Sequence, residues 1–350
     1  MSRDPGAIRP QPGPGVRAWL LTLFGLVALM VALGGAVRLT GSGLSMVDWH
    51  PLMGAILPLD AASWDAVFTQ YQRSPQFQQV NHWMTLADFQ QIFLWEYLHR
   101  LLGRLIGVAF LLPWLYFLLR GKITGRWAHR TAVAFVLGGL QGLLGWYMVQ
   151  SGLTDRPEVS HLRLAAHLGL AFVTALYLLW CWLSLRWPEP GERRPGALRA
   201  LRTLGALVAL QVVYGAFMAG LRAGHLSSTF PLMQGSLFPL HLVTGMSFEE
   251  AAVWSPAGVH LIHRTLGWVV VLATLGCGLW ARRQATSSLQ RRLCVVVVLV
   301  GVAQFLLGAL TVLLSVQPAV AVMHQVGALA LVSAITACDY SFRGGTPLAS

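Results

Sequence analysis

The sequence predicts an all-α polytopic membrane protein with eight transmembrane helices, arranged as two tandem four-helix bundles, and with amphipathic helices in the long outer loops. Three observations predict this fold. Of the 350 residues, 55% are hydrophobic and 11% are charged, whereas about a quarter of the residues of a soluble domain are charged. The apolar residues gather in runs of about 20, enough to cross a hydrocarbon core roughly 30 Å thick. Several motifs of the first half recur in the second half.

The apolar runs are predicted to be helices, because backbone groups in lipid must be hydrogen-bonded within their own segment. The eight predicted spans cover residues 17–38, 92–119, 131–150, 163–186, 198–221, 259–280, 292–314 and 319–338.

Positive charge marks alternate connections between these spans. Lys and Arg cluster in the N-terminal tail and after the second, fourth and sixth spans, as Arg3, Arg9, Arg17, Arg120, Lys122, Arg126, Arg130, Arg186, Arg193, Arg194, Arg199, Arg202, Arg282, Arg283, Arg291 and Arg292. The positive-inside rule therefore predicts a multi-pass protein of the bacterial inner membrane with both termini in the cytoplasm. The net charge of +12 thus reflects topology in a lipid environment, and no nucleic-acid partner is expected.

Two outer connections are long, residues 39–91 and 222–258. In the first, SWDAVFTQYQ and FQQVNHWMTLADFQQIF place apolar residues at helical spacing, which predicts amphipathic helices over the outer face. In the second, turn residues in HLSSTFP precede a short predicted helix near SFEEAAVW.

The repeated motifs divide the chain into two related halves. Helix-borne HRLLG at His99 recurs as HRTLG at His263, QGLLG at Gln141 recurs as QFLLG at Gln304, and His167 matches His324. We therefore expect a flexible cytoplasmic tail over 1–16, an N-terminal half over 17–190, a C-terminal half over 191–340 and a second cytoplasmic tail over 341–350.

Four histidines in matched positions are the candidate ligands. His99, His167, His263 and His324 fall in the outer part of the membrane by the topology above, where ionisable residues are costly and usually functional. Neutral imidazole binds haem iron well, and two histidines on facing helices of a bundle can hold a haem from both sides. The expected pairs are His99 with His167, and His263 with His324. A single membrane histidine could instead serve only as a hydrogen-bonding residue.

Arginines and one glutamate accompany the histidines. Arg100, Arg264, Arg38 and Arg222 suit haem propionates, because arginine pairs with carboxylates through two parallel bonds. Their alternative role is to reach lipid phosphates. Glu96 lies three residues before His99 and hence on the same helix face, while the matching residue before His263 is His260. Glu96 could be catalytic, or could anchor the histidine by a hydrogen bond.

The residues named so far resemble the haem A synthase family over nearly the whole chain. GGAVRLTGSGLSMVDWHPLMGAILP resembles its first outer loop, and FLWEYLHRLLGRLIG resembles its glutamate-and-histidine motif. LGWYMVQSGL, VSHLRLAAHL, MAGLRAGHLSSTFPLM, HLIHRTLG and VMHQVGAL resemble its later segments. One subgroup has a cysteine pair in the first outer loop. This sequence has its cysteines at positions 181, 277, 294 and 338, so it is similar to the other subgroup, and a thiol-based step in that loop is in doubt.

The resemblance implies an oxidoreductase that converts haem O to haem A, oxidising the C8 methyl group to formyl through a hydroxylated intermediate. It implies a substrate-haem site at His99, His167, Arg38 and Arg100, with Glu96 as the catalytic residue. It also implies a haem b site at His263, His324, Arg222 and Arg264, with haem b as the electron relay. Partners would include a haem O synthase and cytochrome oxidase assembly factors. The electron acceptor, the source of the oxygen and formation of a homo-oligomer are left open.

Two other readings compete. A dihaem, cytochrome b-like electron-transfer protein would need both histidine pairs but no haem chemistry, and Glu96 in one half argues against it. A transporter would place polar residues at mid-membrane, whereas those of this chain cluster at the outer ends of the spans.

Overall fold

The computed structural model describes residues 11–48, 56–154, 157–187 and 191–344. Eight helices of this part of the chain are long and apolar enough to cross a membrane, which confirms the predicted spans. They are α1 (Pro14–Leu39), α3 (Leu86–Leu119), α4 (Arg126–Gln150), α5 (His161–Arg186), α6 (Pro195–Gly220), α7 (Pro256–Arg283), α8 (Ser288–Leu313) and α9 (Pro318–Ser341). Both predicted tails lie largely outside the described residues.

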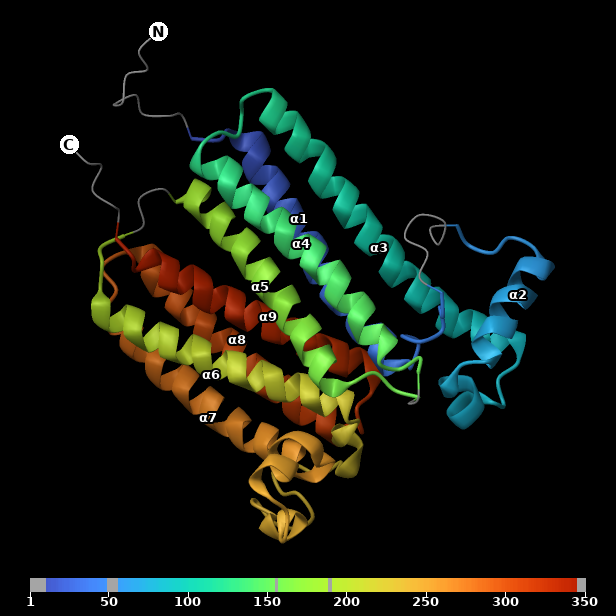
Figure 1. The fold of residues 1–350 in the computed structure, drawn as a ribbon. Helices are drawn as coiled ribbons and strands as arrows, with labels where there is room; N and C mark the ends of the chain where they lie inside the picture. Colours follow the sequence, from blue (N-terminus) through green and yellow to red (C-terminus); the bar gives the residue numbers. More distant parts are fainter. Residues whose placement is uncertain (1–10, 49–55, 155–156, 188–190, 345–350) are drawn as a thin grey trace.

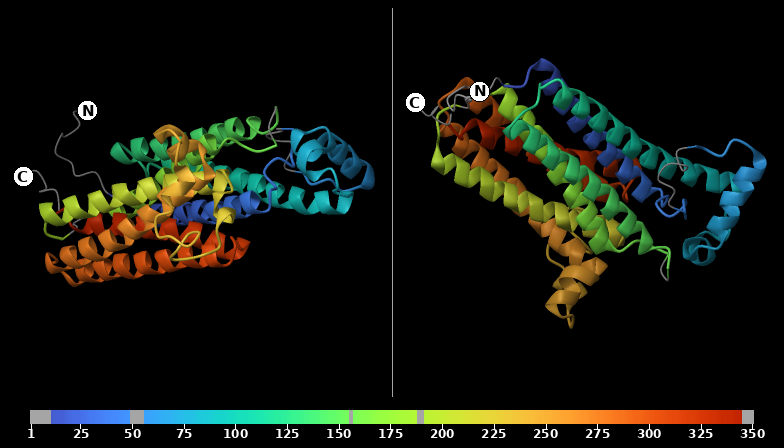
Figure 2. Two further views of the ribbon diagram at one scale, coloured as in Figure 1. Left: turned by 90° about the horizontal axis from the view of Figure 1, so that it is seen from below. Right: turned by 45° about the horizontal axis from the view of Figure 1, so that its top comes forward.

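The eight helices form one elongated bundle, in which α1 begins and α9 ends at the same end (Figure 1). Four helices, α1, α5, α6 and α9, pack against one another in the middle of the bundle, while α3 and α4 flank them on one side and α7 and α8 on the other (Figure 2). The main core contains Leu20 of α1, Ala175 of α5, Leu201 of α6 and Ile335 of α9. The division into two repeated bundles stays a prediction.

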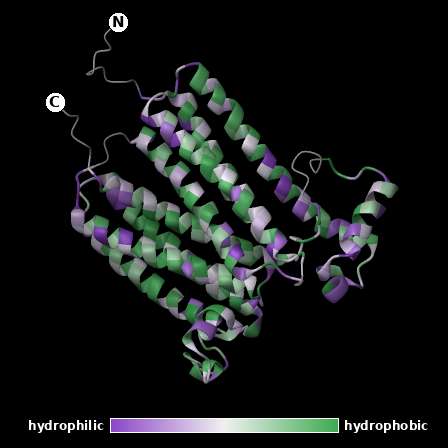
Figure 3. Ribbon diagram, viewed as in Figure 1, coloured by the Kyte–Doolittle hydropathy of each residue, from purple (hydrophilic) through white to green (hydrophobic). Residues whose placement is uncertain are grey.

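Large apolar side chains remain exposed on the helices at the periphery of the bundle. Leu112, Leu272 and Leu299 are more than 60% exposed on α3, α7 and α8, and hydrophobic residues cover most of these helices (Figure 3). Such surfaces suit contact with lipid chains, as expected for membrane-spanning helices.

The helix α3 begins earlier than predicted. Thr85 and Asp88 form a reciprocal capping box that satisfies the first backbone N–H groups, so the helix begins at Leu86. The segment FQQVNHWMTLADFQQIF is therefore not a separate amphipathic helix: a short helix covers Phe77–Asn81, and the remainder continues into α3. The other predicted loop helices are confirmed, as α2 (Ala61–Gln72) and as a short helix over Glu250–Trp254.

The first outer loop packs as a lid against the beginning of α3. Tyr71 of α2 stacks on Phe89 with ring centroids 5.0 Å apart, and Trp64 packs against Phe93. The Tyr71 hydroxyl donates to Gln76, and the Gln76 amide donates to the carbonyl of Gly41. The lid is thereby tied to the outer end of α1.

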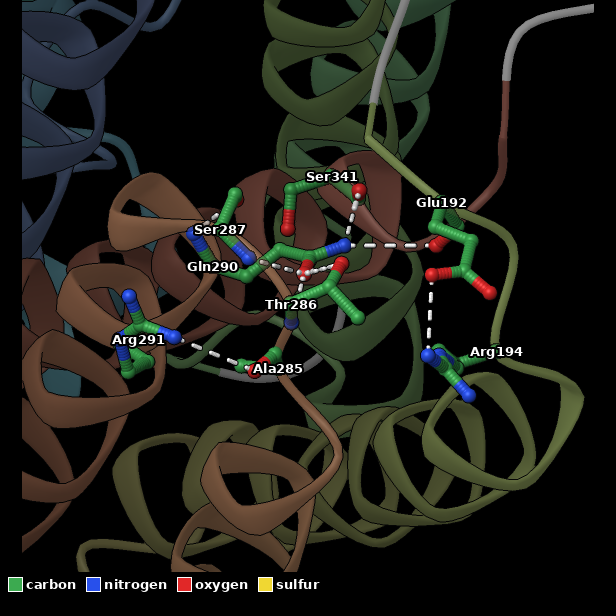
Figure 4. Close-up of polar contacts among 8 residues, drawn as sticks. All are labelled: Glu192, Arg194, Ala285, Thr286, Ser287, Gln290, Arg291 and Ser341. Carbon is green, nitrogen blue, oxygen red and sulfur yellow. Dashed lines mark hydrogen bonds and ion pairs between the residues drawn. The ribbon is translucent and has the colours of Figure 1, made fainter.

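At the opposite end of the bundle, one buried glutamine joins three segments from residue 191 onward. The Gln290 amide nitrogen donates to the carbonyls of Ser341 and Glu192, and its oxygen accepts from Thr286 and Ser287 (Figure 4). Gln290 therefore fastens the segment between α5 and α6 to the beginning of α8 and the end of α9.

Candidate functional site

The structure brings the predicted histidines together in the C-terminal half. His263 of α7 and His324 of α9 face each other with ring centroids 6.5 Å apart and planes at 88°. Two imidazoles on opposite sides of one iron would have centroids roughly 6 Å apart, given metal–nitrogen bonds of about 2 Å. The Nδ1 atoms of both rings are buried and have no hydrogen-bond partner in the described chain. The main chain of a glutamine lies beside each ring. This donor pair fits a haem iron.

The N-terminal pair occupies corresponding helices. His99 lies on α3 and His167 on α5, and the two rings are close enough to interact electrostatically. The chemistry of this donor set is therefore the same as that of the C-terminal pair, namely two imidazoles from facing helices.

Each ring lies against a glycine of the adjacent helix. A Cβ atom added to Gly145 or Gly308 would come within 2.9 Å of Cε1 of His167 or His324. Added to Gly34 or Gly215, it would approach His99 or His263 to 3.2 and 3.4 Å. A larger residue would displace the rings, so these glycines give the imidazoles their room.

Three glutamines approach the histidines, one turn from these glycines. The amide nitrogens of Gln141, Gln211 and Gln304 donate to the main-chain carbonyls of His167, His263 and His324, at 2.9–3.0 Å. The sequence had marked Gln141 and Gln304 only as parts of a repeat, and Gln211 had been missed because its surroundings, QVVYG, differ from QGLLG.

Glu96 is buried in a network that joins α3 to the first outer loop. One carboxylate oxygen accepts from the Ser45 hydroxyl at 2.8 Å and from the Met46 N–H at 2.9 Å. The other accepts from Arg100 at 2.5 Å. Three donors thus satisfy the carboxylate, as a buried polar group requires. Sequence analysis identified Glu96 but not Ser45, which is far away along the chain.

Arg100 and Arg264 hold outer loops. Arg100 donates to the carbonyls of Met46 and Asp48. Arg264 donates to the carbonyls of Thr229, Pro231 and Leu232. Both guanidinium groups thus lie on loop carbonyls, because a loop passes beside each helix at this point; their contact with haem propionates stays a prediction.

Arg38 and Arg222 meet where the predicted halves adjoin. Arg38 of α1 donates to the carbonyl of Gly220, at the end of α6. Arg222 pairs with Glu158 at 3.0 Å, and both side chains are about half exposed, so the pair is weak. The Nε atom of Arg38 is buried and has no hydrogen-bond partner in the described chain. An anionic group could take this donor.

The chain is similar to known proteins along most of its length. The model of the COX15-CtaA family, described as cytochrome oxidase assembly protein, matches residues 17–336. Proteins named "Heme A synthase" are similar along most of their length: those of Maricaulis maris and Nitrosospira multiformis are both 40% identical, covering 94% of this chain and 96% and 93% of the relatives. That of Rhodospirillum centenum is 41% identical, covering 93% of this chain and 90% of the relative. The chain therefore belongs to the COX15-CtaA family of cytochrome oxidase assembly proteins.

Proposed function

We propose that this membrane protein is an oxidoreductase that converts haem O to haem A, oxidising the C8 methyl group to formyl through a hydroxylated intermediate. The main support for this reaction is that the two matched histidine pairs have unequal surroundings. His99 has the carboxylate of Glu96 on its helix face, whereas His263 has His260 at that position. The near-full-length similarity to proteins named "Heme A synthase" supports the same reaction.

The N-terminal pair is proposed to hold the substrate. His99 and His167 would bind the iron of haem O and thereby orient its porphyrin between α3 and α5. Haem O carries a long apolar tail, so a site among lipid-facing helices keeps that tail out of water.

Glu96 is proposed as the catalytic residue. Its carboxylate is held in one orientation by Ser45, Met46 and Arg100. In that position it can accept a proton that is released when electrons leave the methyl group, or stabilise the positive charge that develops there. The same contacts fasten the first outer loop, so closing the loop and orienting the carboxylate are coupled.

The C-terminal pair is proposed to hold haem b through His263 and His324. When bound, haem b would supply one-electron transfer, which relays the electrons that oxidation of the methyl group releases in pairs. The residues of this half hold the ring pair in place and keep water from it.

Arg38 and Arg222 are the proposed propionate partners. The Nε atom of Arg38 is buried and has no partner in the described chain. Arg222 pairs with the half-exposed carboxylate of Glu158, a contact that a propionate could replace. Arg100 and Arg264 would contribute through the loops that they hold, in addition to any propionate contact.

The placement in the cell follows from the charge pattern. We propose that both termini face the cytoplasm of a bacterium and that the haem sites lie toward the outer face of the inner membrane. A membrane haem O synthase is the natural supplier of substrate, and cytochrome oxidase assembly factors are proposed partners.

Haem analysis of the purified protein tests this function. Protein from cells that make haem O is expected to carry haem B together with haem O, haem A or the hydroxylated intermediate. Recovery of haem B alone, with a bis-histidine spectrum, would instead favour a cytochrome b-like electron-transfer protein.

A further inference from the structure

The surroundings of the four histidines differ in one side chain. Three of the rings lie in a cradle formed by a glutamine and, four residues later, a glycine of the adjacent helix: Gln141 and Gly145, Gln211 and Gly215, Gln304 and Gly308. The fourth ring, that of His99, lies against Gly34, and the residue four positions before Gly34 is Met30.

Met30 occupies the place that glutamine takes in the other half. Gly103 and Gly267 each follow a ligand histidine by four residues. A Cβ atom added to Gly267 would lie 3.6 Å from Nε2 of Gln211, and one added to Gly103 would lie 3.6 Å from Cε of Met30. The two side chains therefore reach the same point between a matched pair of helices.

The glutamine does two things that methionine cannot. Its amide nitrogen donates across the helix pair to the main-chain carbonyl of the histidine, and in two cradles it also lies 3.2–3.5 Å from a ring nitrogen. Its amide oxygen is buried in all three cradles without a partner in the described chain, a spare acceptor beside the ring. Methionine has no donor, and its thioether is a weak acceptor.

We propose that the three glutamines are positioning residues for haem ligation and that His99, with Met30 in their place, is the exchangeable ligand of the substrate pair. This inference rests on the proposed function. A ligand histidine is normally oriented by a hydrogen-bonding neighbour, and loss of that neighbour weakens metal binding by about 10- to 100-fold. Haem b stays bound between two cradled histidines, whereas the substrate must enter and the product must leave.

The asymmetry gives a reason for the division of labour between His99 and His167. His167 keeps its glutamine and holds the iron throughout. His99 can release the iron at a smaller cost in binding free energy. It lies on α3, the helix that also carries Glu96 and against which the first outer loop packs. Opening of the outer loop and release of haem would then involve the same helix, α3.

Transfer of haem to excess apomyoglobin tests the proposal on the full-length protein loaded with both haems. Extraction and chromatography separate haem B, from the C-terminal site, from haem O and haem A, from the N-terminal site. We expect the wild-type protein to lose haem O and haem A about tenfold faster than haem B, within the range for lost hydrogen-bonding neighbours of metal-bound histidines.

Two substitutions exchange the cradles. Met30→Gln is expected to slow the loss of haem O and haem A about tenfold, whereas Met30→Leu, which adds no amide, leaves it at the wild-type rate. Gln211→Met, at the place that Met30 takes in the N-terminal half, is expected to speed the loss of haem B by a similar factor. The haem of the unaltered half reports whether each variant is folded.

The outcomes separate the two proposals. If both haems are present but Met30→Gln behaves like Met30→Leu, or if Gln211→Met retains haem B as the wild type does, the cradle proposal is overturned while the proposed function stands. If the wild-type protein contains no haem in the N-terminal half, the proposed function itself fails and this inference fails with it.

Discussion

The N-terminal and C-terminal halves carry the same histidine pair on corresponding helices, yet they surround it differently. Beside the first pair lie a buried carboxylate, Glu96, and an apolar residue, Met30; at the matching places beside the second pair lie His260 and Gln211. The first half also fastens a loop to Glu96 through Ser45. Under the proposed function, the difference would let one frame hold a haem permanently in one half and admit it as substrate in the other, through a few side chains around the ligands.

The largest effect is expected on removing a ligand from the C-terminal half. His263→Ala should abolish bound haem b, because one imidazole of a facing pair is lost and the iron keeps a single protein ligand. His99→Ala should leave haem b in place and deplete only the N-terminal site. The measurement is the optical spectrum with extracted haem content, and a bis-histidine haem b spectrum in His263→Ala would contradict the pairing.

The next effect concerns Glu96, which distinguishes the halves chemically. Glu96→Gln should keep both haems but slow conversion of haem O to haem A by about 10²- to 10⁴-fold, the usual contribution of a general acid or base. The control is Asp65→Asn, which alters an exposed carboxylate of α2. Near-normal yields of haem A from Glu96→Gln would reduce this residue to a fastening for the loop.

The smallest effect concerns the aromatic lid of the N-terminal half. Tyr71 donates to Gln76 and accepts from Asn81, so Tyr71→Phe should lower the local stability of α2 by about 1 kcal/mol. The measurement is hydrogen exchange of the α2 amides. Exchange over Leu240–Val243, in the other outer loop, should stay unchanged.

Alkaline pH should produce the same loosening of the lid. Burial raises the pKa of the Tyr71 phenol above its usual value, so the folded lid holds this proton more tightly than the unfolded segment does. The stabilisation is fully present below pH about 10, the ordinary tyrosine pKa, and is lost as the pH rises through the raised value. Tyr71→Phe should lack this alkaline loss; an equal loss in the variant would assign it to another group.

Much of the fold could be predicted from the sequence, because a membrane-spanning helix is recognised from a single continuous run of apolar residues. All eight spans follow from apolar runs, and the matched histidines follow from short motifs such as HRLLG and HRTLG. The beginning of α3 was placed six residues late, since the capping box of Thr85 and Asp88 precedes the apolar run. The sequence shows this capping box as T-x-x-D, within a segment whose helical spacing of apolar residues also suits an amphipathic loop helix.

Contacts between distant segments could not be predicted in the same way. Arg100 and Arg264 each donate to loop carbonyls that lie more than 30 residues earlier in the chain, contacts that no local motif indicates. The sulfur atoms of Cys294 and Cys338, on α8 and α9, lie 3.6 Å apart, a contact that no motif in the sequence indicates. Such neighbours depend on how helices are packed, which periodicity within one helix does not report.

The sequence by itself thus determined the number of spans, their ends to within a few residues and the candidate ligands, because lipid requires each span to satisfy its own backbone and permits few ionisable residues. Only the tertiary structure decided what surrounds those ligands. Each of these surroundings joins separate segments: the glutamine cradles, Met30 beside His99, and the three donors to Glu96. A hydrogen bond between segments forms only where packing brings donor and acceptor within about 3 Å.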